Sequence, residues 1–167
     1  MAKELGSRLV SLAGWEEKMV GGRSGPGRVV VGVDDSEHGR HALAVAAAIA
    51  EQQGWELRIV HGWHIAYPAA PFMIPPVEIE AAGQAAAEAV VSRLELDILG
   101  GSPGLDVTRR IEAGPPAELL VEESKGAELL VVGSRGRGGF SSLTLGSVSS
   151  ACVHHARCPV LVLRRRQ

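Results

Sequence analysis

Aromatic residues, cysteines and excess charge are all scarce in this chain of 167 residues. Aromatics make up only 4% of it, which disfavours an aromatic-rich β-sandwich and favours alanine-rich helices packed on a valine-rich sheet. Two cysteines are too few for a disulfide framework. The net charge of −2 provides no strongly positive surface, so we expect no nucleic-acid partner.

Long apolar runs are also missing. No stretch approaches the roughly 18 apolar residues that a membrane-spanning helix needs. Near the N-terminus, Lys3 is followed directly by Glu4 and no sustained apolar segment comes after it, so we expect no signal peptide. These features predict a cytoplasmic protein with no membrane partner.

The first 27 residues differ in composition from the rest of the chain. Glycine, serine and proline make up most of residues 21–27, a composition that is typical of a flexible linker. From residue 28 onward, valine-rich and alanine-rich segments alternate, as in a globular domain. We therefore expect a flexible N-terminal extension over 1–27 and one domain over 28–167.

Five short apolar segments alternate with four helical patterns in that domain. The strands are expected at 28–33, 57–61, 105–111, 128–132 and 160–163. Such alternation predicts one α/β domain, with a parallel sheet and helices on both faces. Apolar and charged residues alternate over 105–111, which indicates a strand at the edge of the sheet.

The helices show capping residues and apolar stripes. Asp34, Asp35 and Ser36 provide N-cap side chains before the first helix, and Gly54 ends it. The second helix ends at Gly100–Gly101, and Pro115–Pro116 suit the first turn of the third. Two helices are expected to bury an apolar face. In the second helix this face consists of Ile79, Ala82, Ala86, Val90 and Leu94. In the fourth helix it consists of Val148, Ala151, Cys152 and His155.

The segment VVGSRGRGGFSSLTLGSVSS, residues 131–150, has the most distinctive spacing. Two residues separate Gly133 from Gly136, nine more separate Gly136 from Gly146, and Ser147 follows directly. Glycines allow backbone N–H groups to approach a phosphate, and the N-terminus of the following helix attracts an anion. Further candidates are the hydroxyls of Ser147 and Ser149 and the positive charges of Arg135 and Arg137.

A second polar feature is expected beside this glycine loop. In an open α/β sheet, ligands bind beyond the carboxyl ends of the strands, where the strand order reverses. With the order 3-2-1-4-5, the strand that ends at Asp34 would lie next to the strand that ends at Gly133. Asp34 could accept hydrogen bonds from ribose hydroxyls, so the two features predict a nucleotide site. The alternative is that the glycine-rich turn is a plain connector.

Several nucleotide and hydrolase signatures are absent. The chain has no G-x-x-x-x-G-K-[ST] loop, no G-x-G-x-x-G after the first strand and no G-x-S-x-G elbow. It also lacks the S-G-G-x-D-[ST] and H-x-G-H signatures of enzymes that adenylate substrates. No general base is evident beside the expected phosphates, so any hydrolysis of a bound nucleotide should be slow.

The complete pattern G-x-x-G-x(9)-G-[ST], together with VVVGVDDSE, GPPAELL and HARCPVLVLR, resembles the universal stress protein family over residues 28–165. The resemblance implies a single Rossmann-like domain, similar to the adenine nucleotide α-hydrolases, with five strands in the order 3-2-1-4-5. It also implies ATP binding, commonly with Mg²⁺, and a regulatory role in the stress response with an unidentified protein partner. A nucleotide-free dimeric scaffold and a cyclic AMP-binding protein remain alternatives.

The resemblance also implies individual roles. Val33, Gly62 and Val132 would border the adenine, and Asp34 and Gly133 would contact the adenosine, chiefly its ribose. The phosphates would be held by Arg135, Gly136, Gly146, Ser147, Val148 and Ser149. A homodimer would form through the last strand, Val160–Leu163.

Other residues are given structural roles. The group Cys152, His154, His155 and Cys158 has no standard zinc spacing, so we expect no metal site there. His61 and His64 are expected to be structural or exposed to solvent. The proline-rich loop 67–76 is interpreted either as a partner surface or lid, or as a stiff connector.

Overall fold

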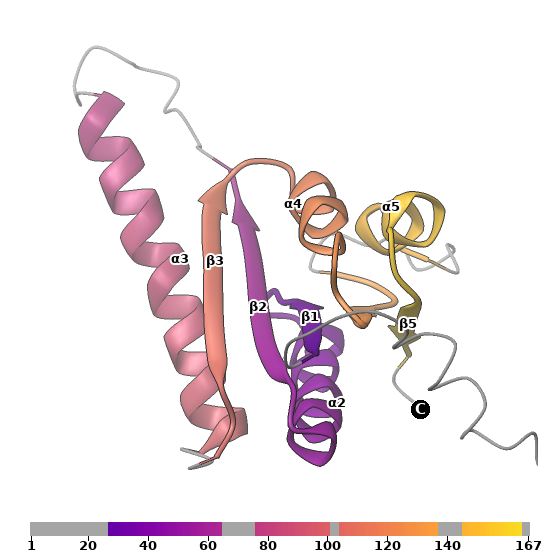
Figure 1. Ribbon diagram of the computed structural model, residues 1–167. Coiled ribbons are helices and arrows are strands. Elements are labelled where there is room, and N and C mark those ends of the chain that lie inside the picture. The colour runs from indigo at the N-terminus through magenta and orange to yellow at the C-terminus, as the bar shows by residue number, and fades with distance from the viewer. Residues whose placement is uncertain (1–26, 65–75, 101–103, 137–144, 165–167) are drawn as a thin grey trace, which may run out of the picture.

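The structure is a computed structural model that describes residues 27–64, 76–100, 104–136 and 145–164. Most of the expected N-terminal extension, nearly all of the proline-rich loop, Gly101 and Arg137 lie outside the described residues. Strands and helices alternate along the chain (Figure 1). Their bounds are β1 Arg28–Gly32, α2 Glu37–Gln53, β2 Glu56–Trp63, α3 Pro76–Leu99, β3 Val107–Ala113, α4 Pro116–Glu123, β4 Leu129–Gly133, α5 Ser147–His155 and β5 Val160–Leu163.

The five strands form one parallel sheet in the order β3-β2-β1-β4-β5. This confirms the predicted fold class and places β3 at an edge. The strand order reverses between β1 and β4, which pair directly with Val31 opposite Val131. Consequently the loops that follow these two strands leave the same edge of the sheet in neighbouring positions.

Two apolar cores lie on opposite faces of the sheet. On one face α2 and α3 cover residues such as Val29, Val31 and Ile59, which are fully buried. On the other, α4 and α5 pack against each other and cover Val30 and Leu130. Figure 1 shows this division, with α3 beside β3 and with α4 next to α5. Alternating side chains on each central strand fill the two cores in turn, which explains the nearly continuous apolar runs of β1 and β4.

Local sequence accounts for both ends of α2. Ser36 is the N-cap, with its Oγ accepting a hydrogen bond of 3.0 Å from the Gly39 N–H. At the other end Gly54 has a φ of 66° and its N–H bonds back to the last turn. Glycine adopts this left-handed conformation without the steric cost that other residues incur. The predicted start and end of this helix are therefore confirmed.

The buried stripe of α3 differs from the predicted one. Ala82 and Ala86 are exposed, whereas Ala87 and Val91 are buried together with the expected Leu94. The stripe continues through Gly83, where a Cβ would lie only 2.2 Å from the indole of Trp63. Packing of α3 against this tryptophan thus fixes the helix rotation, and the alanine-rich sequence did not reveal that rotation.

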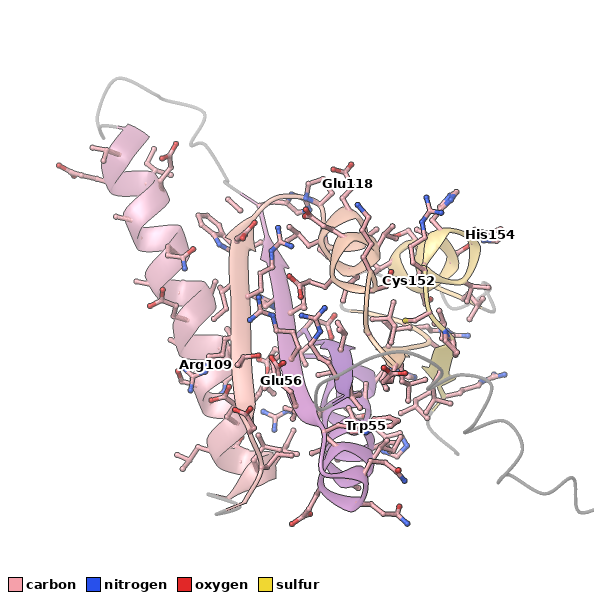
Figure 2. The ribbon with its side chains drawn as sticks, viewed as in Figure 1. Trp55, Glu56, Arg109, Glu118, Cys152 and His154 are labelled. Carbon is pink, nitrogen blue, oxygen red and sulfur yellow. The ribbon has the colours of Figure 1, made fainter. Side chains whose placement is uncertain are left out.

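Smaller differences concern other elements. Strand β2 continues to Trp63, two residues beyond its expected end, and β3 runs from 107 to 113 rather than from 105 to 111. His155 is exposed at the last turn of α5, whereas Cys152 is buried. In Figure 2 Cys152 lies on the sheet side of α5, and His154 points away. The apolar face of α5 therefore ends before its last turn.

A charged network occupies the part of the sheet beside α4. Glu123, the last residue of α4, accepts hydrogen bonds from Arg58 at 3.2 Å and from Arg110 at 3.0 Å. Arg28 lies 3.7 Å from the same carboxylate. These arginines come from β2, β3 and β1, so the single carboxylate links three strands to the end of α4.

Candidate functional site

The predicted glycine loop and the predicted acidic turn do meet in the fold. Val33 and Asp34 follow β1, and Ser134 follows β4, the neighbouring strand. The Gly146 N–H donates a hydrogen bond of 2.7 Å to the Ser134 carbonyl, which ties the start of α5 to the end of β4. Three chain segments distant in sequence therefore converge at the carboxyl edge of the central strands.

A cavity of about 650 Å³ opens at this convergence. Its volume lies within the range of about 300–1,000 Å³ that small-molecule sites occupy. Every predicted site residue lies on its wall, namely Val33, Asp34, Gly62, Val132, Gly133, Arg135, Gly136, Gly146, Ser147, Val148 and Ser149. The structure thus brings all of these residues together, although their contacts with a ligand stay a prediction.

The carboxylate of Asp34 is held by the turn that starts α2. Its Oδ1 accepts hydrogen bonds from the Ser36 N–H, at 3.2 Å, and from the Ser36 hydroxyl. A Cβ on Gly39 would lie 2.5 Å from the same oxygen. A glycine in the first turn of α2 therefore lets the helix approach the carboxylate closely, and this glycine also lines the cavity.

Glycines of the loop after β4 approach the acidic turn equally closely. A Cβ on Gly136 would lie 2.7 Å from Oδ2 of Asp34, and one on Gly133 would lie 2.8 Å from the Cβ of His38. A Cβ on Gly133 would also meet backbone atoms of His38, whereas one on Gly136 would displace the Asp34 carboxylate. Gly133 therefore lets β4 approach α2, and Gly136 lets the loop after β4 approach the Asp34 side chain.

The N-terminus of α5 faces the cavity with Ser147, Val148 and Ser149. Its N-cap Gly146 has no side chain with which to cap the helix, so N–H groups of the first turn are left for another acceptor. The buried Ser149 hydroxyl bonds to the Ser134 and Gly146 carbonyls at 3.1 and 3.0 Å, and its predicted role as a donor to a ligand stays a prediction. Ser147 is exposed and also lines the cavity.

Gly62 has a second role that the sequence did not indicate. A Cβ at this position would lie 2.8 Å from the Cα of Pro116 and 3.0 Å from its Cγ. The end of β2 thus packs directly against the start of α4, and both residues line the cavity. In the sequence, Pro116 indicated only the first turn of a helix.

Other cavity residues were missed as well. They are Gly32, Gly39, Val60, His64, Pro116, Leu120 and Leu145. The strand order contains the signal for His64, because β2 adjoins β1 and ends at the same edge of the sheet. The chain order contains the signal for Leu120, because α4 connects β3 to β4 and packs against β2 and β1, whose ends line the cavity.

The two cysteines lie outside this cavity. Burial raises the pKa of both Cys152 and Cys158 to about 11, so both are thiols at neutral pH. In the described part of the chain no three metal-binding side chains of the His, Cys, Asp and Glu types come together. Nor does any described helix have the length and apolar character needed to cross a bilayer.

Comparison with known proteins identifies the family. The model of the universal stress protein family matches residues 26–164. A universal stress protein of Mycobacterium tuberculosis is 39% identical over 137 residues, which are 82% of this chain but 45% of that protein. This chain therefore spans about half the length of its mycobacterial relatives. A Thermus aquaticus universal stress protein is 36% identical over 138 residues, or 81% of this chain and 97% of that protein.

Solved structures agree with the fold. A universal stress protein from Lactobacillus plantarum, 23% identical, superposes with a TM-score of 0.70 and covers 85% of this chain and all of its own. A universal stress protein in complex with cAMP is 26% identical, with a TM-score of 0.63 over 84% of this chain and 98% of its own. From the family match and the relatives above 30% identity, the chain belongs to the universal stress protein family.

Proposed function

We propose that this protein binds ATP with Mg²⁺ in the cavity between β1, β4 and α5, and that nucleotide occupancy regulates a stress response. One observation carries the proposal. The Asp34 carboxylate, the closely packed backbone at Gly136 and the N-terminus of α5 all line one cavity of about 650 Å³. A carboxylate suits ribose hydroxyls, whereas glycine backbone and a helix N-terminus suit phosphates.

The apolar and polar walls suggest how the nucleotide lies. Val33, Val132 and the Gly62–Pro116 contact form an apolar end that suits the adenine. Asp34 and Gly133 are proposed to contact the ribose. The loop from Arg135 onward and the first turn of α5 are proposed to bind the phosphates, where Arg135 adds positive charge.

The donor groups also fit a magnesium ion that arrives with the nucleotide. Mg²⁺ in nucleotide sites is held by few protein oxygens together with phosphates and water. Ser147, an exposed residue in the first turn of α5, lies on the cavity wall where the phosphates are proposed to bind. When bound, the ion would neutralise phosphate charge, and the Ser147 hydroxyl is the candidate to hold it.

A second candidate ligand is cyclic AMP. The observation that favours it is the related structure in complex with cAMP, at 26% identity. The adenine and ribose would occupy the same positions in both ligands. ATP and cyclic AMP differ in how far their phosphates would extend along the loop after β4. Titration with both nucleotides separates these cases.

We also propose a homodimer through β5. This strand lies at an open edge of the sheet, and its sequence, Val160–Leu163, carries no charge. The opposite edge strand, β3, carries Arg109, Arg110 and Glu112, and charged edge strands resist pairing. Of the two edges, β5 is therefore the one suited to pairing with a second copy.

The test of nucleotide binding has two steps. First, purified protein is denatured and any released nucleotide is identified by chromatography and mass. Second, ATP with Mg²⁺, cyclic AMP and AMP are titrated into nucleotide-free protein by calorimetry. We expect ATP to bind most tightly and to be hydrolysed slowly.

A matched pair of glycine variants links the binding to the cavity. Gly136→Val should abolish ATP binding, because a side chain there collides with Asp34. Gly104→Val is the control, since no described atom lies within 4 Å of a Cβ at that position. Preference for cyclic AMP over ATP would transfer the proposal to that ligand, and no nucleotide binding by folded wild-type protein would favour the scaffold alternative.

A further inference from the structure

His61 makes a hydrogen bond that connects β2 to the acidic turn of the cavity. Its Nδ1 lies 2.8 Å from the carbonyl oxygen of Val33, the residue directly before Asp34. A carbonyl oxygen can only accept a hydrogen bond, so the proton of this bond lies on Nδ1 of His61. The imidazole therefore holds the backbone from which the Asp34 side chain projects.

The position of His61 in the sheet explains why it can make this bond. Side chains alternate along β2, so His61 lies on the same face as Leu57 and Ile59, both fully buried. The Val33 N–H still donates to the Val60 carbonyl at 3.0 Å, which extends the β1–β2 pairing by one residue. The chain then turns toward α2, and the His61 side chain supplies a donor for the Val33 carbonyl at this turn.

The bond belongs to a short series of contacts that ends at the cavity. Asp34 follows Val33 and accepts from the Ser36 N–H, and Ser36 in turn caps α2 through the Gly39 N–H. A shift of the Val33 carbonyl would therefore move the Asp34 carboxylate relative to Gly136. His61 itself does not line the cavity, so it acts on a ligand only through this turn.

We infer that His61 is a positioning residue, whose Nδ1–H bond to the Val33 carbonyl sets the Asp34 carboxylate for recognition of ribose hydroxyls. The inference rests on the proposed nucleotide function and deepens it. Its consequence is selective, because a loss of the bond should weaken recognition of the ribose more than recognition of the base or phosphates.

Two variants of similar polarity separate this role from general stability. In His61→Asn the side-chain amide occupies the place of Nδ1 and keeps a donor there. In His61→Gln the amide lies farther out, near the place of Nε2, and the donor to Val33 is lost. Each variant, with wild type, is titrated with ATP and with 2′,3′-dideoxy-ATP, which lacks both ribose hydroxyls.

Wild type and His61→Asn should prefer ATP over the dideoxy analogue by about tenfold or more, the usual effect of a hydrogen bond to a charged group. For His61→Gln this ratio should fall to about two or less, while binding of the dideoxy analogue changes little. In a double variant with Asp34→Ala, the His61→Gln change should have no further effect on the ratio. A parallel loss for both nucleotides, with an unchanged ratio, would overturn the inference.

A measurement without nucleotide keeps this test independent of the proposed function. Hydrogen exchange of the Ser36 and Gly39 amides reports on the turn directly, since both N–H groups are bonded within it. In His61→Gln these amides should exchange about tenfold faster than in wild type or His61→Asn. Equal exchange in all three proteins would overturn the inference, whereas failure of wild type to bind any nucleotide would overturn the proposed function.

Discussion

At the scale of single residues, glycines determine how closely the elements around the cavity approach one another. Gly62, Gly133 and Gly136 each face a neighbour that a Cβ would meet at 2.7–2.8 Å. The neighbours are different, namely Pro116, His38 and Asp34. Gly133 and Gly136 belong to the glycine spacing that the sequence displays. Gly62 does not, because it lies within strand β2.

Gly62→Ala should destabilise the protein by about 1–3 kcal/mol, the usual cost of overpacking. The added methyl would meet backbone atoms of Pro116, which cannot move aside as a flexible side chain could. Urea unfolding measures the effect, with Gly104→Ala as the control. Equal unfolding midpoints for the two variants would show that Gly62 and Pro116 are not in close contact.

The cysteines offer a prediction about pH. Burial raises the pKa of Cys158 to about 11, so its thiolate fraction at pH 8 is small. Alkylation of Cys158 by iodoacetamide should therefore accelerate about tenfold per pH unit between pH 8 and pH 10. Cys152, which is fully buried, should stay unmodified until the protein unfolds.

Mass spectrometry of timed samples follows each cysteine separately. Protein unfolded in urea is the control, in which both thiols should react with an ordinary pKa. A rate for Cys158 that reaches its plateau near pH 9 in the folded protein would contradict the prediction.

At the scale of elements, α4 connects the cavity with the charged network. Its first residue, Pro116, and Leu120, one turn later, line the cavity, and its last residue, Glu123, contacts arginines of three strands. Burial alone raises the pKa of Glu123, but hydrogen bonds from Arg58 and Arg110 outweigh it and hold the pKa below its ordinary value. The ionised carboxylate therefore stabilises the position of α4 on the sheet.

Glu123→Gln should lower the free energy of unfolding by about 2 kcal/mol at pH 7. This is less than the ~3–5 kcal/mol lost when one partner of a fully buried ion pair is removed. The arginines are 18–27% exposed, so solvent screens part of the interaction. Because the folded pKa is lowered, this stabilisation is present above the unfolded value of 4.5 and is lost as the pH falls through the folded pKa.

Urea unfolding at pH 7 and at pH 3 measures the loss of stability and its dependence on pH. The difference in the free energy of unfolding between variant and wild type should be smaller at pH 3. Glu118→Gln on the exposed side of the same helix is the control, and Figure 2 shows this side chain pointing away from the sheet. If the difference in the free energy of unfolding stayed constant with pH, the carboxylate charge would not be what holds α4 on the sheet.

At the scale of the whole molecule, the geometry of β5 determines how a dimer could form. The carbonyls of Pro159 and Leu163 accept hydrogen bonds from β4 and the residue after it, at 3.0 and 2.7 Å. Backbone groups alternate in direction along a strand, so the N–H and carbonyl groups of Val160 and Val162 face the open edge. These are the groups available to a second copy.

Val162→Pro should abolish the dimer while leaving the monomer folded, because proline is tolerated where the lost N–H faces outward. Leu161→Pro is the matched variant, and it should lower stability, since the Leu161 N–H faces β4. Sedimentation equilibrium gives the oligomeric state, and thermal unfolding gives the stability. A Val162→Pro protein that stays dimeric would show that the copies associate elsewhere.

Much of this molecule was determined by local sequence alone. Apolar periods revealed the strands and helices in their succession along the chain, and capping residues revealed both ends of α2, because these signals depend on neighbours along the chain. The strand order 3-2-1-4-5 was implied by the family resemblance and not by the periodicity. The glycine spacing and Asp34 indicated the cavity, since the strand order brings the ends of β1 and β4 together.

Contacts between distant segments decided the rest. Only the tertiary structure showed the rotation of α3 set by Trp63, the Gly62–Pro116 contact, the internal bonds of the Ser149 hydroxyl and the link from His61 to Val33. Each of these features is a contact between residues far apart in the sequence. It depends on the direction of a side chain, and no local sequence pattern encodes that direction. The sequence by itself therefore determined the fold and the place of the site, and tertiary packing decided which atoms face it.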